Sequence, residues 1–151
     1  MFQRPGERVG AQDLLEVMGH GSGNVRRHDL VDEATLARVR RSLRQDLISA
    51  GVESSIEFDC LVAVTEACTN ALLHGHGDEV PCVTWRINGT TAFFTVEDYS
   101  KQRWAKLDTE DGSRETRVGG FGLDLMERLM DRVDITIEDH GTTVELTKRI
   151  G

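Results

Sequence analysis

Three polar side chains with the chemistry of a catalytic site recur every four residues in the middle of this 151-residue sequence: Glu66, Asn70 and His74. In a helix that spacing places them on one face, although any one of them alone could belong to a solvated surface. A carboxylate and an amide oxygen one turn apart suit Mg²⁺ that keeps water and phosphate oxygens as its other ligands, as it does with a nucleotide. Glu66 would then be free to orient or deprotonate a nucleophile.

A glycine-rich run, GGFGL at 119–123, stands where a long polar segment enters a predicted helix. Glycines let backbone N–H groups approach an anion, and the helix N-terminus adds a favourable dipole. Arg114 and Arg117 lie just upstream. Turn chemistry alone could also explain the run, which matches neither a dinucleotide-binding fingerprint nor a loop followed by Gly-Lys-Ser/Thr.

Two strand ends supply further candidates. Asp98 ends one predicted strand, and Thr142-Thr143 opens the last one. Strand ends of an antiparallel sheet can converge. A carboxylate placed there can accept a hydrogen bond from the exocyclic amine of adenine.

A zinc site is an alternative interpretation, because His74 and His76 could coordinate the metal together with Glu66 or Asp78. The sequence does not favour it, since there is neither a third well-placed histidine nor a pair of cysteines at zinc spacing.

The elements that must position these residues follow from hydrophobic periodicity. Asp32 reads as the N-cap of a helix that ends at Gly51, and the other face of that helix carries Arg38, Arg41 and Arg44, either as a solvated face or as a docking surface. Cys60 and Cys68 lie on or beside the apolar stripe of the next helix and are expected in the core. The expected segments are strands at 27–31, 82–87, 91–96, 134–138 and 143–147, helices at 32–51, 55–74 and 119–131, and a long loop at 97–118. This order predicts an α/β (α+β) two-layer sandwich with a mixed, largely antiparallel sheet.

Charge and composition exclude several classes of protein. The 18 Lys and Arg residues against 26 Asp and Glu residues give a net charge of -8, which argues against sequence-independent nucleic-acid binding. Three cysteines without a CxxC pattern predict no disulfide framework, and no apolar run is long enough to span a membrane. We expect a cytoplasmic protein with a flexible N-terminal tail over 1–25 and one domain over 26–151.

Taken together and in order, these motifs resemble the Bergerat (GHKL) ATP-binding fold and, more narrowly, bacterial anti-sigma-factor serine kinases of the RsbW type. The N-box of that family is similar to TEACTNALLHG at 65–75, its G-x-G box to GFGL at 120–123, and its terminal strand to GTTV at 141–144. The resemblance covers residues from about 26 to 149.

The resemblance implies ATP and Mg²⁺ as cofactors, with Glu66 as catalytic base and Asn70 as the Mg²⁺ ligand. Asp98 would bind the adenine amine with Thr143 nearby, and the segment from about Lys101 to Val118 would be an ATP lid. The implied nucleotide-binding residues are Asn70, His74, Asp98, Arg117, Gly119, Gly120, Gly122, Leu123 and Thr143.

One motif departs from the family. Where the family has Asp-x-Gly-x-Gly, this chain reads DYSKQ at 98–102, so Ser100 and Gln102 replace both glycines. Side chains there would crowd a loop that lies against the nucleotide, which affects affinity and turnover but not the fold.

The resemblance implies a regulatory kinase that sequesters a sigma factor and phosphorylates a serine or threonine of a STAS-type antagonist, as a possible homodimer. One alternative is a partner-sequestering module that turns ATP over weakly or not at all. Another is the catalytic module of a histidine kinase, which the lack of a phospho-acceptor helix pair disfavours. Neither nucleic acid nor a membrane is expected as a partner.

Overall fold

The computed structural model describes residues 25–74, 79–99 and 120–151. Apart from their ends, the predicted tail over 1–25 and the predicted loop over 97–118 lie outside these residues. The described elements are, in order, β1 (Arg26–Asp29), α2 (Glu33–Ser49), α3 (Ser54–His74), β2 (Cys82–Asn88), β3 (Thr91–Asp98), α4 (Gly120–Leu129), β4 (Arg132–Glu138) and β5 (Gly141–Arg149). The predicted order of helices and strands is confirmed, with ends that shift by at most two residues.

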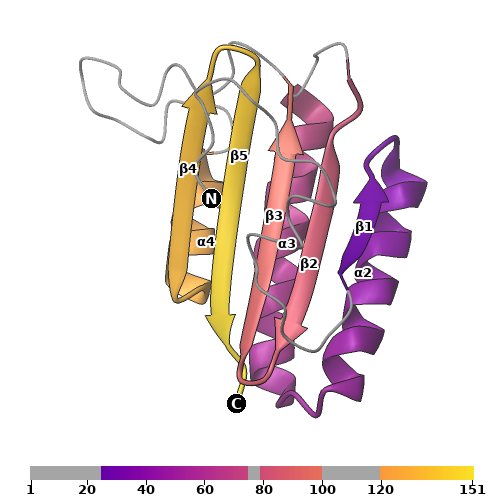
Figure 1. Cartoon of the computed structure of the whole chain (residues 1–151), viewed down its shortest axis with the longest axis vertical. Helices are drawn as coiled ribbons and strands as arrows, with labels where there is room; N and C mark the ends of the chain where they lie inside the picture. Colours follow the sequence, from indigo (N-terminus) through magenta and orange to yellow (C-terminus); the bar gives the residue numbers. More distant parts are fainter. Residues whose placement is uncertain (1–24, 75–78, 100–119) are drawn as a thin grey trace.

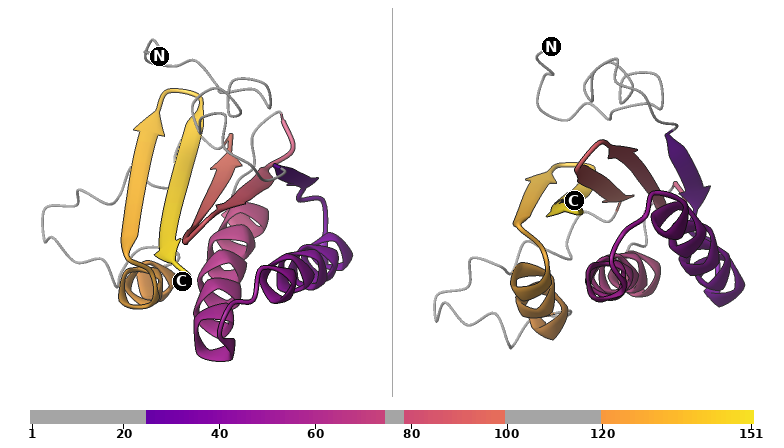
Figure 2. Two further views of the ribbon diagram at one scale, coloured as in Figure 1. Left: turned by 60° about the horizontal axis from the view of Figure 1, so that its bottom comes forward. Right: turned by 90° about the horizontal axis from the view of Figure 1, so that it is seen from below.

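The five strands form one sheet in the order β1-β2-β3-β5-β4. The prediction of a largely antiparallel sheet is confirmed, but its mixed character is not, because all four pairings are antiparallel. Tight hairpins join β2 to β3 and β4 to β5, and such short connections allow only antiparallel neighbours. Helices α2, α3 and α4 lie together on one face of the sheet, as the two views of Figure 2 show.

The core lies between that helical layer and the sheet. Every second residue of β3 faces the helices. These residues, Ala92, Phe94 and Val96, are at most 2% exposed. Because side chains of a strand alternate between its two faces, Asp98 shares this helix-facing side. Cys60 and Cys68 are fully buried in α3, which confirms their expected place in the core.

The β2–β3 hairpin turns one residue later than the Asn88-Gly89 pair suggests. Asn88 pairs with Thr91 and stays in the sheet, so the two turn residues are Gly89 and Thr90. Gly89 has a φ of +61°, whereas the φ of Thr90 is negative. A positive φ at the first turn position alone is typical of a type II′ turn, in which glycine takes that place.

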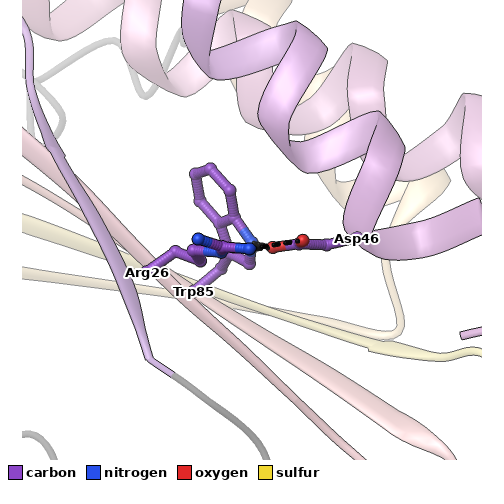
Figure 3. A network of polar contacts seen from close by, with 3 residues as sticks. All are labelled: Arg26, Asp46 and Trp85. Carbon is purple, nitrogen blue, oxygen red and sulfur yellow. Dashed lines mark hydrogen bonds and ion pairs between the residues drawn. The ribbon is translucent and has the colours of Figure 1, made fainter. Parts of the chain in front are cut away.

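Two aspartates, Asp32 and Asp46, hold the ends of α2 through polar contacts. Asp32 caps the helix as predicted, because its carboxylate accepts a hydrogen bond of 2.9 Å from the backbone N–H of Thr35. Near the other end, Asp46 accepts from Nε1 of the buried Trp85 at 2.9 Å and from Nε of Arg26 at 3.0 Å (Figure 3). Asp46 thus attaches α2 to both β2 and the edge strand β1.

The three buried cysteines form no disulfide bonds. Cys60, Cys68 and Cys82 are all free, and burial raises the pKa of Cys60 and of Cys82 to about 12. At neutral pH these thiols are therefore protonated and poorly nucleophilic. No helix in the described part of the chain is long and apolar enough to cross a membrane.

Candidate nucleotide site

The predicted catalytic pair lies against the start of α4. A Cβ atom built on Gly122 would stand 2.6 Å from Oε1 of Glu66 and 3.1 Å from Nδ2 of Asn70. Glu66 and Asn70, one turn apart on α3, therefore converge on the same glycine. The sequence placed these residues on two separate motifs, and the packing of α3 against α4 brings the motifs together.

The buried amide of Asn70 is a candidate ligand group. Asn70 is only 6% exposed, and its Nδ2 has no hydrogen-bond partner among the described residues. A buried polar atom without a partner costs about 1–3 kcal/mol, so its persistence points to a group that is supplied from outside. Rotation of the amide exchanges its nitrogen and oxygen, so the same position can offer an oxygen to a cation.

A second cluster forms where β3 ends and β5 begins. Asp98, 2% exposed, lies directly opposite Thr142, 3% exposed, in the antiparallel register. A Cβ on the preceding Gly141 would overlap the carbonyl of Asp98 and come within 2.9 Å of the Cα of Tyr99. Glycine at position 141 is therefore what allows the two chain segments to approach here.

The register places Thr142, and not Thr143, beside Asp98. Thr143 lies opposite Glu97, whose side chain points to the sheet face away from the helices. The sequence prediction named Thr143 as the threonine near Asp98. The alternation of apolar residues along this strand indicates Thr142 instead. Val144 and Leu146 are apolar and alternate, so they face the core, and Thr142 falls on their side.

Both clusters lie toward one end of the molecule. Figure 1 shows the C-terminal ends of α3 and β3 and the N-terminal end of β5 at the top of the sheet. His74 is the last residue of α3, one turn beyond Asn70, and Gly120 is the first residue of α4. Leu123 is 3% exposed within the core, so its side chain packs and only its backbone is left for a ligand. Arg117, Gly119, His76 and Asp78 lie outside the described residues.

Comparison with known proteins assigns the chain to a family. The family described as "Histidine kinase-like ATPase domain" matches residues 31–148, which include every candidate residue described above. The chain belongs to this family. Its nucleotide is accordingly ATP, and its relatives place it in the RsbW-type branch.

Among the relatives of this RsbW-type domain is the serine-protein kinase RsbW of Listeria monocytogenes serovar 1/2a, which is 34% identical over 125 residues. That alignment covers 74% of this chain and 77% of the kinase. The anti-sigma F factor of Anoxybacillus flavithermus is also 34% identical, over 58% of this chain, and the chain spans only 65% of that relative's length.

Two solved structures share the fold of the RsbW-type domain. The RsbU and RsbW domains of Rv1364c from Mycobacterium tuberculosis superpose with a TM-score of 0.64 at 24% identity, over 85% of this chain and 32% of that one. The SiaB–SiaC complex from Pseudomonas aeruginosa gives a TM-score of 0.57 at 13% identity, over 95% of this chain and 100% of the matched chain.

Proposed function

We propose that this domain is an ATP-dependent serine/threonine kinase that regulates a partner protein, with Glu66 as the catalytic base. The observation that carries the proposal is the convergence of Glu66 and Asn70 on Gly122, where a Cβ would meet both side chains. A carboxylate at this place can take the proton of an attacking hydroxyl as the bond to the phosphorus forms. A domain that only held nucleotide would have no need of a base there.

Mg²⁺ is the cation that this donor set fits. Asn70 supplies a buried amide without a partner among the described residues, and Glu66 supplies a carboxylate one turn away. Asn70 would hold the ion, which when bound neutralises charge on the phosphates. The glycines at 120 and 122 have no side chains that would cover the backbone N–H groups of the first turn of α4, and these groups would bind the same phosphates.

The adenine end of the nucleotide is assigned to the second cluster. Asp98 would accept a hydrogen bond from the exocyclic amine, and Thr142 lies opposite it with a hydroxyl that can donate or accept. His74 and Arg117 remain proposed contacts on the resemblance alone.

The partners follow from the names of the relatives. The domain would phosphorylate a serine or threonine of a STAS-type antagonist and sequester a sigma factor, as the names anti-sigma F factor and serine-protein kinase RsbW suggest. We include a homodimer, a cytoplasmic location and the tail-plus-domain division at residue 25 in the proposal.

A module that sequesters partners with little ATP turnover is the second candidate. Ser100 and Gln102 favour it, because they replace the two family glycines that follow Asp98.

One set of measurements separates the two candidates. A fluorescent ATP analogue, titrated with and without Mg²⁺, reports binding, and mass spectrometry of a STAS-type antagonist from the same organism reports phosphorylation. We expect Glu66→Gln to bind nucleotide like the wild type but to transfer phosphate about 10²–10⁴-fold more slowly, the usual effect of a lost general base. Asn70→Ala should weaken Mg²⁺-dependent binding as well.

Glu33→Gln is the matched control, because Glu33 is exposed in the first turn of α2. It should change neither measurement. Transfer by Glu66→Gln at the wild-type rate would contradict the kinase mechanism, and wild-type protein that binds ATP without transfer would favour the sequestering module.

A further inference from the structure

Helix α3 is apolar on the side that faces away from the sheet as well as on the side that packs against it. Phe58 is 64% exposed and Leu73 is 58% exposed, near the two ends of the helix. Between them, Val62, Thr65 and Thr69 lie on the same outward side and are partly exposed. None of these side chains carries a charge. Large exposed apolar side chains aligned in this way are typical of interaction surfaces.

The spacing of these residues is that of a helix-packing seam. Positions 58, 62, 65, 69 and 73 follow one another in steps of three or four, and we call them the α3 seam (Phe58, Val62, Thr65, Thr69 and Leu73). Steps of four and three keep one stripe of a helix against a neighbouring helix, as in coiled coils. The seam is about 22 Å long at 1.5 Å per residue, which is about four turns of contact for a second helix.

A basic row borders the seam on its α2 side. Nε of Arg44 donates to Oε2 of Glu57 at 3.0 Å, so Arg44 stands at the boundary between α2 and α3. Arg40, Arg41 and the 55%-exposed Ile48 are three or four residues from Arg44 and share its side of α2. In a chain with a net charge of -8, this helix carries four arginines against two acidic residues.

The seam is separate from the nucleotide site. Glu66 and the buried Asn70 point toward α4, where they meet Gly122. A protein on the outward face of α3 would therefore leave the Glu66 side of the helix untouched.

We infer that the α3 seam binds an amphipathic helix of a partner protein, with apolar residues at heptad spacing and acidic residues along the edge that meets the α2 arginines. The apolar seam provides the contact area. The positive charge of the basic row favours a partner helix with negative charge along one edge and sets the orientation in which that helix binds. This surface is additional to the proposed kinase site and does not depend on phosphate transfer.

The test uses the full chain and a fluorescein-labelled synthetic helix of about 21 residues, with leucine at the seam positions and glutamate along one edge. Fluorescence anisotropy should show binding that Phe58→Asp and Arg41→Glu each weaken about tenfold or more, as expected when an apolar anchor is lost and when a charge is reversed. Ile137→Asp is the matched control, because Ile137 is a 42%-exposed apolar residue on β4. It should leave binding unchanged. A peptide with lysine in place of glutamate should bind wild-type protein about tenfold more weakly.

Nucleotide binding checks that each variant is folded, and Leu73→Asp replaces Phe58→Asp if the latter is not. Wild-type protein that does not bind the acidic peptide, or equal weakening by Phe58→Asp and Ile137→Asp, would overturn the proposal. So would sedimentation that shows a dimer of the chain which Phe58→Asp dissociates, because the occupant would then be a second copy.

Discussion

Gly122 of α4 lies so close to Glu66 of α3 that a single methyl group on residue 122 would stand 2.6 Å from the carboxylate oxygen Oε1. Glu66 Oε1 is the end of a flexible side chain, so Gly122→Ala should displace the carboxylate instead of unfolding the protein. Alanine also favours a helix over glycine by about 1 kcal/mol. We expect Gly122→Ala to lose most phosphate transfer while its thermal midpoint stays equal or rises.

Gly51→Ala provides the opposite case. Gly51 has a φ of +75° with open space around it, so alanine there is strained but touches nothing. This variant should lose about 1 kcal/mol of stability and keep its activity. If Gly122→Ala keeps full activity, the contact with Glu66 has no role in catalysis.

Asp98 should make the site selective for adenine. Guanine presents a carbonyl oxygen where adenine has its amine, so two acceptors would face each other at a cost of about 1–3 kcal/mol. We expect GTP to compete with the fluorescent ATP analogue about tenfold or more weakly than ATP, and Asp98→Asn to reduce this difference. Equal competition by ATP and GTP against wild-type protein would contradict the assignment of Asp98.

Thr142 and Thr143 offer a matched pair on adjacent positions of β5. Valine has nearly the shape of threonine but no hydroxyl, so the substitution tests the hydrogen bond alone. Thr142→Val should weaken ATP binding about fivefold, in line with one lost hydrogen bond of about 1 kcal/mol. Thr143→Val should leave the affinity unchanged, because Thr143 pairs with Glu97 on the opposite face. The reverse order of effects would restore Thr143 as the nucleotide contact.

Asp46 should be important for stability without taking part in catalysis. Asp46→Ala would leave Nε1–H of Trp85 buried without its acceptor, since Trp85 is 1% exposed. We expect a loss of about 1–3 kcal/mol in urea unfolding followed by tryptophan fluorescence. Asp46→Asn keeps an acceptor for Trp85 and should lose less. Equal losses for both variants would mean that the ion pair with Arg26, not the tryptophan bond, provides the stabilisation.

His28 should make stability depend on pH. Its ring stacks on Trp85 with centroids 5.3 Å apart, and burial together with the charges of Arg26 and Arg38 lowers the pKa of His28 below 6.5. The unfolded chain then binds a proton more readily, so stability is full above about pH 6.5 and falls as the pH drops toward the folded pKa. His28→Phe keeps the stacking and should lose less stability between pH 7 and pH 5 in urea titrations. Identical pH profiles for variant and wild type would rule out His28 as the source.

Local patterns in the sequence determined the elements and the chemistry of the catalytic pair. Asp32 caps α2 because a short acceptor side chain at that place bonds the first turn whatever the rest of the chain does. The spacing of Glu66 and Asn70 fixes their common helix face for the same local reason. The antiparallel pairing of β2 with β3 and of β4 with β5 likewise follows from short connections between strands that are close in sequence.

Contacts between distant segments were decided only by the tertiary structure. The meeting of Glu66 with Gly122 depends on how α3 packs against α4, and the pairing of Asp98 with Thr142 depends on the register of β3 and β5. A register shift of one residue would have put Thr143 there, because side chains alternate across a strand. The attachment of Asp46 to Trp85 joins residues 39 positions apart, and nothing local in either segment specifies its partner.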